Sequence, residues 1–319
     1  MTQPPASPDV SVIITVKDGA ATVGHAVASA LAQAAVTEVV VVDDGSQDDT
    51  PQVVTRADDG SGRLKLIRLD QNQGPAHGRN LGIASSTASF ICILDADDFM
   101  APDRLERMFS ISGDGWDMVA DDIIFTEGVG DTDGYDRLFD EDVTLPRTIT
   151  LSEMVLGNMP RKDRHRRELG FVKPIVRRQF LNDHSLSYDE TLRLGEDVIL
   201  YSRALLAGAR FIAVEACGYF AVERSDSLSS SHSSDDLGRF ANALMALEAD
   251  VAAVGGPTGD VKTYRRNIQQ RYALCKALDA KRADGWFGFV QACREAGQDG
   301  GFVVRELVLA KLATLARGR

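Results

Sequence analysis

The sequence predicts an α/β protein with a mostly parallel sheet flanked by helices and with a helical C-terminal extension. Residues 10–94 alternate short β-branched runs with segments of helical pattern, and from Leu237 onward the pattern is helical apart from a Gly-Gly-Pro break. Strand–helix–strand repetition with short turns is typical of a parallel sheet that helices cover on both faces. We therefore expect a sheet domain at residues 1–235 and a helical extension at residues 236–319.

Four buried strands are expected near the N-terminus, because each run is too short for a helix and is rich in Val and Ile. They are Val10–Val16, Glu38–Val42, Leu64–Leu69 and Ser89–Leu94. Helices are expected between them at His25–Gln33, from Asp48-Asp49 with Pro51 in the first turn, and at Pro75–Ala84. An acidic residue followed by a first-turn proline is a common helix start.

Beyond residue 110 the pattern of strands and helices is looser. Further strands are expected at Asp117–Phe125, Phe171–Val176 and Phe211–Val214, and a helix is expected to begin at Gly195-Glu196-Asp197. The polar segments Glu127–Asp142, Arg161–Glu168 and Glu223–Asp236 are expected to be loops.

The composition excludes several classes of protein. Lys and Arg number 35 against 47 Asp and Glu, a net charge of −12, which disfavours general binding to nucleic acid. The four cysteines have no zinc-like spacing. The first residues lack a signal-peptide pattern and no run of 18 apolar residues occurs, so we expect a cytoplasmic protein. Peripheral contact with the inner face of the membrane stays open.

Carboxylates follow three of the four predicted N-terminal strands. Residues 15–18, 43–46 and 95–98 come directly after strands, and ligands of parallel sheets bind beyond the carboxyl ends of the strands. Any one of these aspartates is typical of a turn. Together they would repel one another unless a cation joined them. Asp95-Ala96-Asp97 offers the oxygen ligands that suit Mg²⁺ or Mn²⁺, with a diphosphate completing the coordination.

The segments of the chain, taken in order, resemble family 2 glycosyltransferases, which have the GT-A fold. The matching pieces span roughly residues 9–232: VSVIITVKDGAATVGHAVASALAQ, VVVVDDGSQDDT, NQGPAHGRNLGIASS, FICILDADDFMAPDRLERM and FLNDHSLSYDETLRLGEDVILYSRALLAGARF. The resemblance implies a nucleotide-diphospho-sugar donor, a divalent metal and inversion at the anomeric carbon. It divides the predicted domain into a nucleotide-sugar half at about 1–112 and an acceptor half at about 113–235.

The resemblance also implies roles for individual residues. Asp44 is similar to the carboxylate that accepts a hydrogen bond from uracil, Asp97 to a metal ligand, and Asp197 to the catalytic base. Asp95 would contact the ribose or the metal, and Arg79 would lie near the donor. Further donor contacts are implied for Thr15, Lys17, Asp18 and, through an R-x-x-S pattern with Ser227, Arg224. Lys17 departs from the family, because many members carry an aromatic residue there that stacks on the base.

Each of these side chains also has a purely structural interpretation. Asp44 could cap a turn, and Arg79 could pair with a nearby carboxylate. Glu196-Asp197 suits the dipole at a helix start without any catalysis. His232 could be a metal ligand or a diphosphate donor, but a loop histidine is more often only solvated.

Two further segments bear on possible partners. Arg161–Arg167 is interpreted as a solvated turn, with a patch for a lipid diphosphate or an anionic membrane as the alternative. Phe302–Ala316 has apolar residues at helical spacing, which favours packing on the domain or on a homodimer partner over membrane insertion.

The predicted function is that of an inverting, metal-dependent glycosyltransferase. It would move a hexose from a UDP-sugar to a saccharide or to a polyprenyl-diphosphate-linked saccharide, with Mg²⁺ or Mn²⁺ held by Asp95 and Asp97. Two alternatives stay open. Lys17 is compatible with a subunit that binds nucleotide sugar without turnover. A phosphatase with an aspartate nucleophile would instead carry its DxD after the first strand, not the fourth.

Overall fold

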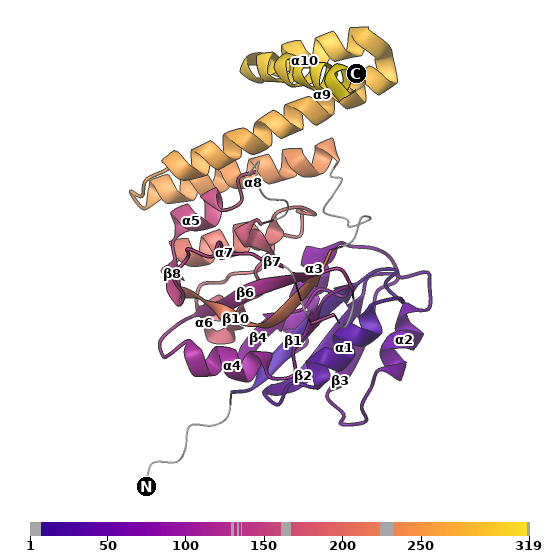
Figure 1. The fold of residues 1–319 in the computed structure, drawn as a ribbon, viewed down its shortest axis with the longest axis vertical. Helices are drawn as coiled ribbons and strands as arrows, with labels where there is room; N and C mark the ends of the chain where they lie inside the picture. Colours follow the sequence, from indigo (N-terminus) through magenta and orange to yellow (C-terminus); the bar gives the residue numbers. More distant parts are fainter. Residues whose placement is uncertain are drawn as a thin grey trace. The chain divides into compact units, whose positions relative to one another are not determined.

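The computed structural model describes residues 8–128, 131–132, 134, 136–160, 167–223 and 233–317. The chain divides into two compact units, Met1–Ser227 and Leu228–Arg319. The first unit contains a β-sheet with helices packed on it, and the second is built from helices (Figure 1).

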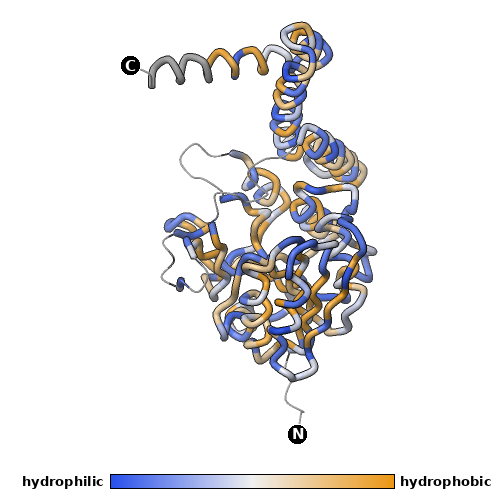
Figure 2. The backbone as a smooth tube through the Cα atoms, turned by 90° about the vertical axis from the view of Figure 1, so that its right-hand side faces the viewer, coloured by the Kyte–Doolittle hydropathy of each residue, from blue (hydrophilic) through white to orange (hydrophobic). Residues whose placement is uncertain are grey.

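The first four strands form the parallel part of the sheet. Their bounds are β1 (Val10–Val16), β2 (Val36–Asp43), β3 (Leu64–Arg68) and β4 (Phe90–Ile93), in the order β3-β2-β1-β4. Ile13 of β1 lies opposite Val40 on one side and Ile93 on the other. The two inner strands are apolar along most of their length because helices cover both faces (Figure 2). The four predicted strands are present, and β1, β2 and β4 are mostly buried as expected, whereas the edge strand β3 has no fully buried residue.

The second half of the sheet mixes strand directions. Its strands are β9 (Ile175–Arg177), β6 (Met118–Thr126), β10 (Phe211–Val222) and β5 (Phe99–Met100), with β7 (Asp136–Arg137) paired to β6 and β8 (Arg147–Ile149) paired to β10. β9 runs antiparallel between β4 and β6, whereas β6 and β10 are parallel. The sheet is therefore mixed but mostly parallel, as predicted.

Three expected segments differ from the structure. The strand predicted at Phe171–Val176 begins only after Pro174, and a short 3-10 helix, Leu169–Phe171, precedes it. The strand predicted at Phe211–Val214 continues to Val222, because an irregularity between Val214 and Tyr219 lets the chain resume pairing with β6. The acidic segment Glu127–Asp142, predicted as a loop, contributes the two residues of β7. Residues 161–166 and 224–232 of the two other predicted loops lie outside the described residues.

Seven helices of the described residues belong to the first unit. They are α1 (Val23–Leu31), α2 (Thr50–Arg56), α3 (Pro75–Ala84), α4 (Arg104–Ile111), α5 (Leu151–Leu156), α6 (Arg178–Asp183) and α7 (Glu196–Leu206). α3 has the bounds that the sequence predicts. α2 begins at Thr50, where Asp48 Oδ1 accepts from the Thr50 backbone N–H at 3.0 Å.

Two glycines let α3 lie unusually close to β1. A Cβ atom at Gly82 would stand 2.4 Å from Ile13 Cγ2, and one at Gly78 would stand 2.8 Å from Thr15 Cγ2. Any larger residue would push the helix off the strand. This close contact fixes the position of Arg79, the residue after Gly78.

The second unit consists of α8 (Ser234–Ala253), α9 (Gly259–Glu295) and α10 (Gly300–Arg317). α9 is interrupted at Asp284-Gly285, where Gly285 has a φ of +64°. The helical pattern predicted after the Gly-Gly-Pro break therefore corresponds to the two parts of α9 and to α10. Their core consists of Ala273, Ala277, Phe289, Ala292 and Val303. None of the helices in the described part of the chain combines the length and the hydropathy that a bilayer crossing requires.

A fully buried ion pair connects the two halves of the sheet, because its arginine, Arg104, also donates to Cys92 Sγ of β4 in the first half. Arg104 Nη2, at the start of α4, lies 2.7 Å from Asp121 Oδ1 of β6, and neither side chain is more than 1% exposed. The other oxygen of Asp121 accepts from the backbone N–H groups of Cys217 and Tyr219 in β10. Arg104 also donates to the carbonyl oxygen of Lys173, just before β9.

Arg104→Met should lower the free energy of unfolding of the protein by about 3–5 kcal/mol, because it leaves the Asp121 carboxylate buried without its cation. Urea denaturation followed by circular dichroism measures this. The control is Arg282→Ala, which breaks the exposed pair with Asp279 and should cost far less. An Arg104→Met protein as stable as the control would show that the buried pair does not hold the sheet together.

Candidate functional site

The candidate functional site is built around a buried arginine, Arg79, whose side chain contacts three carboxylates. Arg79 Nη1 lies 2.7 Å from Glu196 Oε1 and 3.3 Å from Asp197 Oδ1, and its Nη2 lies 3.3 Å from Asp95 Oδ1. The guanidinium also lies 5.3 Å from the centre of the Tyr188 ring. One side chain of α3 thus connects the end of β4 to the start of α7.

Lys173 joins two of the same carboxylates from the other side. Its Nζ lies 3.0 Å from Asp95 Oδ2 and 3.1 Å from Asp197 Oδ2. The lysine side chain is only 4% exposed, compared with 33% for Asp95 and 12% for Asp197. Each of these two aspartates therefore accepts from Arg79 with one oxygen and from Lys173 with the other. We call these five residues, Arg79, Lys173, Asp95, Glu196 and Asp197, the site network.

Local structure explains how these side chains come to face one another. Glu196 and Asp197 begin α7 directly after Gly195, whose φ of +75° turns the chain into the helix. Asp95 follows β4, and β4 pairs with β1. The helix α3, which carries Arg79, packs closely on β1. Lys173 is held through its carbonyl oxygen by Arg104, as described above. Three segments far apart in sequence therefore deliver one side chain each, and α7 delivers two.

The site network shifts several pKa values. Burial opposes charge on Lys173, but Asp197 and Asp95 raise its pKa above the ordinary value of a lysine. Burial likewise acts against the charge of Asp95, yet Lys173 and Arg79 lower its pKa. Burial raises the pKa of Glu196, with a contribution from Asp197, although Arg79 acts in the opposite direction. The lysine and Asp95 are thus both held in their charged forms near neutral pH.

Asp98 lies beside the DxD but has a different environment. The Tyr219 hydroxyl donates to its Oδ2 at 2.7 Å, and the backbone N–H of Val222 donates to Oδ1 at 3.0 Å. Burial, with the nearby charges of Asp97 and Asp95, raises the pKa of Asp98 well above its ordinary value. The last residue of Asp95-Ala96-Asp97-Asp98 therefore anchors the loop to β10.

The loops after β1 and β2 are joined by the predicted residue Asp18. Its Oδ1 accepts from the Gln47 backbone N–H at 2.7 Å, and its own N–H donates to Ser46 Oγ at 2.8 Å. Lys17 Nζ lies 2.6 Å from Asp18 Oδ2, and both side chains are exposed. At the position where the resemblance implies an aromatic residue in many members, this chain therefore presents an ion pair.

Asp44 and Thr15 each contact a neighbouring segment. Asp44 is 5% exposed, and its two oxygens accept from the backbone N–H groups of Gln73 and Gly74 at 2.6 and 2.8 Å. Thr15 faces α3, with its methyl group against Gly78. Asp44 thus holds the loop before α3, the turn-stabilising role that the sequence left open, and its remaining lone pairs stay available to a ligand.

The structure brings together three of the residues singled out in the sequence, Arg79, Asp95 and Asp197. It also gives Glu196 an inward contact with Arg79, so this residue does more than complement the helix dipole. Arg224, Ser227 and His232 lie outside the described residues. Sequence reasoning missed Lys173. The available signal was a single charged residue within the otherwise apolar run Phe171–Val176.

The chemistry of the site network suits a divalent cation together with an anionic ligand. Three formal negative charges face two positive ones, and Asp97 lies two residues from Asp95. Within the described residues, no three metal-ligating side chains are grouped closely enough to hold an ion alone. A cation at the DxD would therefore need oxygen ligands from a bound anion and from water.

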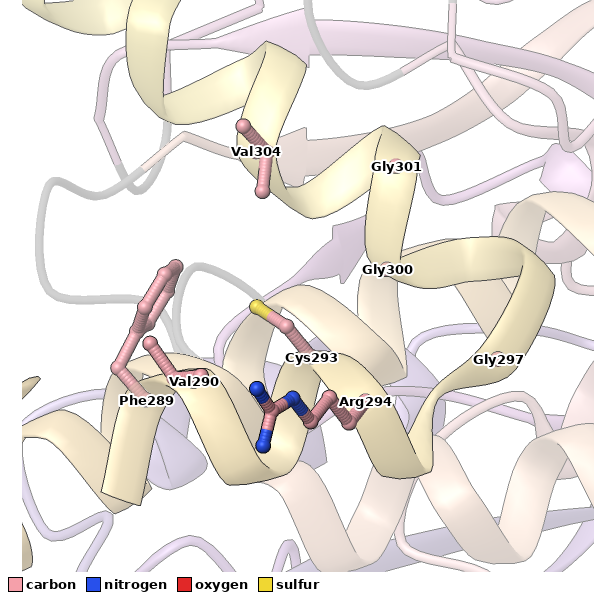
Figure 3. Close-up of a pocket in the computed structure, with 8 residues that line it drawn as sticks. All are labelled: Phe289, Val290, Cys293, Arg294, Gly297, Gly300, Gly301 and Val304. Carbon is pink, nitrogen blue, oxygen red and sulfur yellow. The ribbon is translucent and has the colours of Figure 1, made fainter. Parts of the chain in front are cut away.

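A groove in the second unit lacks this chemistry. It has a volume of about 460 Å³ and lies between α9 and α10 (Figure 3). Its lining contains Phe289, Val290, Cys293, Arg294, Gly297, Gly300, Gly301 and Val304. No carboxylate lines the groove, so it does not compete with the sheet edge as the site of metal-dependent chemistry.

Two curated relatives match most of this chain. The succinoglycan biosynthesis protein ExoU of Rhizobium meliloti (strain 1021) is 45% identical over 284 residues, which cover 88% of this chain and 82% of the relative. The succinoglycan biosynthesis protein ExoO of the same organism is 40% identical over 226 residues, which cover 70% of this chain and 63% of the relative.

Solved structures share the fold. TarS residues 1–349 of S. aureus, in complex with UDP-GlcNAc, superpose with a TM-score of 0.65 at 19% identity, covering 91% of this chain and 81% of that one. The mannosyltransferase PcManGT from Pyrobaculum calidifontis, in complex with GDP-Man and Mn²⁺, gives 0.55 at 18% identity, covering 98% and 81%. The mixed sheet with C-terminal helices is thus a fold found in glycosyltransferase structures.

Comparison of the sequence with protein families and relatives identifies the family of this chain. The model of the family described as "Glycosyl transferase family 2" matches residues 11–178, which run from β1 to the start of α6 and include Arg79, Asp95, Asp97 and Lys173. Together with the 45% identity to a relative covered over 82% of its length, this match shows that the chain is a glycosyltransferase of family 2.

Proposed function

We propose that the protein transfers a hexose from a UDP-sugar to a hydroxyl group of a saccharide, free or linked to a polyprenyl diphosphate, with inversion at the anomeric carbon. The observation that carries this proposal is the site network. It holds a DxD carboxylate, Asp95, and the proposed base, Asp197, on the same two cations. Inverting transfer needs a leaving-group side and a nucleophile side at a fixed spacing.

The relatives support the proposed setting. ExoU and ExoO are named as succinoglycan biosynthesis proteins, and a TarS structure contains UDP-GlcNAc. We infer that this chain performs one sugar transfer in the assembly of an exopolysaccharide of the succinoglycan class. Arg79, on α3, and the exposed Lys17 are the proposed cationic contacts of an anionic donor.

Asp97 and Asp95 are the proposed ligands of Mg²⁺ or Mn²⁺. The PcManGT structure contains Mn²⁺ together with its nucleotide sugar, which supports such a site in this fold. When bound, the ion offsets the negative charge that develops on the departing diphosphate. Lys173 and Arg79 each contact one oxygen of Asp95 and lower its pKa, so a cation would bind at the remaining lone pairs of this carboxylate.

Asp197 is the proposed general base. Arg79 and Lys173 each contact one of its oxygens, which fixes the plane of the carboxylate at the first turn of α7. A sugar hydroxyl is a weak nucleophile near neutral pH, so a carboxylate has to take its proton as the new bond forms. Within the site network Glu196 contacts Arg79 and not Lys173, and we assign it to holding that arginine.

Asp197→Asn should lower the transfer rate by roughly 10²–10⁴-fold, because the amide cannot accept the proton. UDP affinity should change little, since this side chain does not face the nucleotide in the proposed arrangement. Glu196→Gln is the matched variant and should keep most of the turnover. Turnover measured by UDP release with a saccharide acceptor tests both, and the reverse ranking would assign the base to Glu196.

Asp97→Ala should abolish metal-dependent UDP binding while the fold survives, because the diphosphate would then meet an acidic edge without its bridging ion. Titration calorimetry with UDP, with and without EDTA, measures this. Asp103→Ala, an exposed aspartate of the same segment, is the control and should bind as the unaltered protein does. Unchanged UDP affinity in Asp97→Ala, or in EDTA, contradicts the metal assignment.

Lys173→Met should lower kcat by up to roughly 10²-fold, because Lys173 positions Asp197, and it should also raise the KM for the UDP-sugar, because Lys173 contacts the proposed metal ligand Asp95. The kcat of the double variant Lys173→Met/Asp197→Asn should be hardly lower than that of Asp197→Asn alone, since both changes affect kcat through Asp197. Losses that multiply in the double variant would show that Lys173 acts independently of the base.

A further inference from the structure

The charge of the chain is divided unevenly between its two ends. Residues 259–319 contain 12 Lys and Arg against 6 Asp and Glu, whereas residues 1–258 contain 23 against 41. The last two helices therefore carry a net charge of +6 on a chain whose remainder carries −18. A basic end on an acidic protein indicates an anionic partner for that end.

Exposed apolar side chains gather in the same region. Of the ten large hydrophobic side chains that are exposed among the described residues, six lie between positions 286 and 309. These are Trp286, Phe287, Val290, Val304, Val308 and Leu309. Phe287 is 80% exposed and Trp286 is 65% exposed. A concentration of this kind marks an interaction surface, because single exposed hydrophobic residues are normally scattered.

The interruption of α9 presents the two aromatic residues. Asp284 and Gly285 leave the helical conformation, and Trp286 and Phe287 follow directly. Trp286 is held by edge contact with the buried Phe289, at 5.4 Å between ring centres, and Lys281 Nζ lies 4.2 Å from the centre of its ring. The tryptophan is thus fixed at the surface beside a positive charge.

Exposed apolar side chains continue from Trp286 and Phe287 along the groove between α9 and α10. Val290 on α9 and Val304 on α10 both line it, and Arg294 is its one charged residue (Figure 3). Val308 lies one turn beyond Val304 on the same face of α10. Many residues of this helix are hydrophobic (Figure 2). We call Trp286, Phe287, Val290, Val304 and Val308, with Lys281, Arg282 and Arg294, the aromatic–basic face.

We propose that the aromatic–basic face docks on the surface of an anionic lipid bilayer. Aromatic and aliphatic side chains beside Lys and Arg are the composition with which helices lie in the interface of a membrane. The basic residues draw the protein to anionic headgroups, while Trp286 and Phe287 enter the headgroup region. No described helix is suited to crossing the bilayer, so the contact is one of surface binding.

The two tryptophans of the chain make this docking directly measurable. Trp116 is 3% exposed in the first unit, whereas Trp286 is largely exposed. The full-length protein is mixed with vesicles of phosphatidylcholine alone or with phosphatidylglycerol added. We expect a blue shift of tryptophan emission and co-sedimentation with the anionic vesicles only, both reduced at high salt.

Variants assign the effect to this face. Phe287→Ser and the double change Lys281→Glu/Arg282→Glu should each lower vesicle binding at least 10-fold. Met245→Ser, which removes an exposed hydrophobic side chain of α8 outside the face, should bind as the unaltered protein does. UDP release with a water-soluble saccharide acceptor should be equal in all of these proteins, so this proposal can fail without affecting the proposed transfer reaction.

Two outcomes would overturn the docking proposal. One is equal binding to both kinds of vesicle by the unaltered protein and by Phe287→Ser. The other is a blue shift that appears without vesicles as protein concentration rises, together with a dimer in sedimentation velocity that Phe287→Ser abolishes. That second result would assign the face to another copy of this chain.

Discussion

The ion pair of Arg104 and Asp121 determines how the two halves of the sheet meet. Both groups are buried, so each charge has to be matched by the other and by hydrogen bonds. Arg104 lies on α4, the helix after the DxD segment, and Asp121 lies on β6. The second oxygen of Asp121 accepts hydrogen bonds from backbone N–H groups in the irregular part of β10. The same guanidinium also donates to the carbonyl oxygen of Lys173. The ion pair of Arg104 and Asp121 therefore also positions the lysine of the site network.

The site network extends this principle from stability to function. Asp95 and Asp197 have different proposed tasks, yet each accepts from Arg79 with one oxygen and from Lys173 with the other. A change in the position of either aspartate would therefore be transmitted to its neighbour through two cations. Such mutual restraint holds both carboxylates in place before a substrate arrives, and it reduces the reorganisation that the reaction requires.

The two ends of the chain differ in charge, which the overall composition does not show. The net charge of −12 describes an acidic protein, but this value averages a strongly acidic sheet unit and a basic pair of terminal helices. An acidic catalytic unit suits cation-dependent binding of a nucleotide sugar. A basic, aromatic-bearing helical unit suits the surface on which lipid-linked saccharides are located.

The sequence alone determined most of the fold and the donor-side candidates. Short apolar runs of four to eight residues indicate strands when turns separate them from helical patterns, and carboxylates that follow parallel strands meet at one edge of the sheet. Asp95 and Asp97 could therefore be chosen from their position after a strand, and Asp197 from the resemblance to family 2 glycosyltransferases. Lys173 could not, because β9 is a three-residue strand that pairs antiparallel between β4 and β6, far away in sequence. Pattern cannot specify such a register, which is decided by tertiary packing and by the bond from Arg104. Asp44 was a candidate from the sequence, but its contact with a loop almost thirty residues later was decided by tertiary packing. So was the contact between α3 and β1 that directs Arg79 into the site.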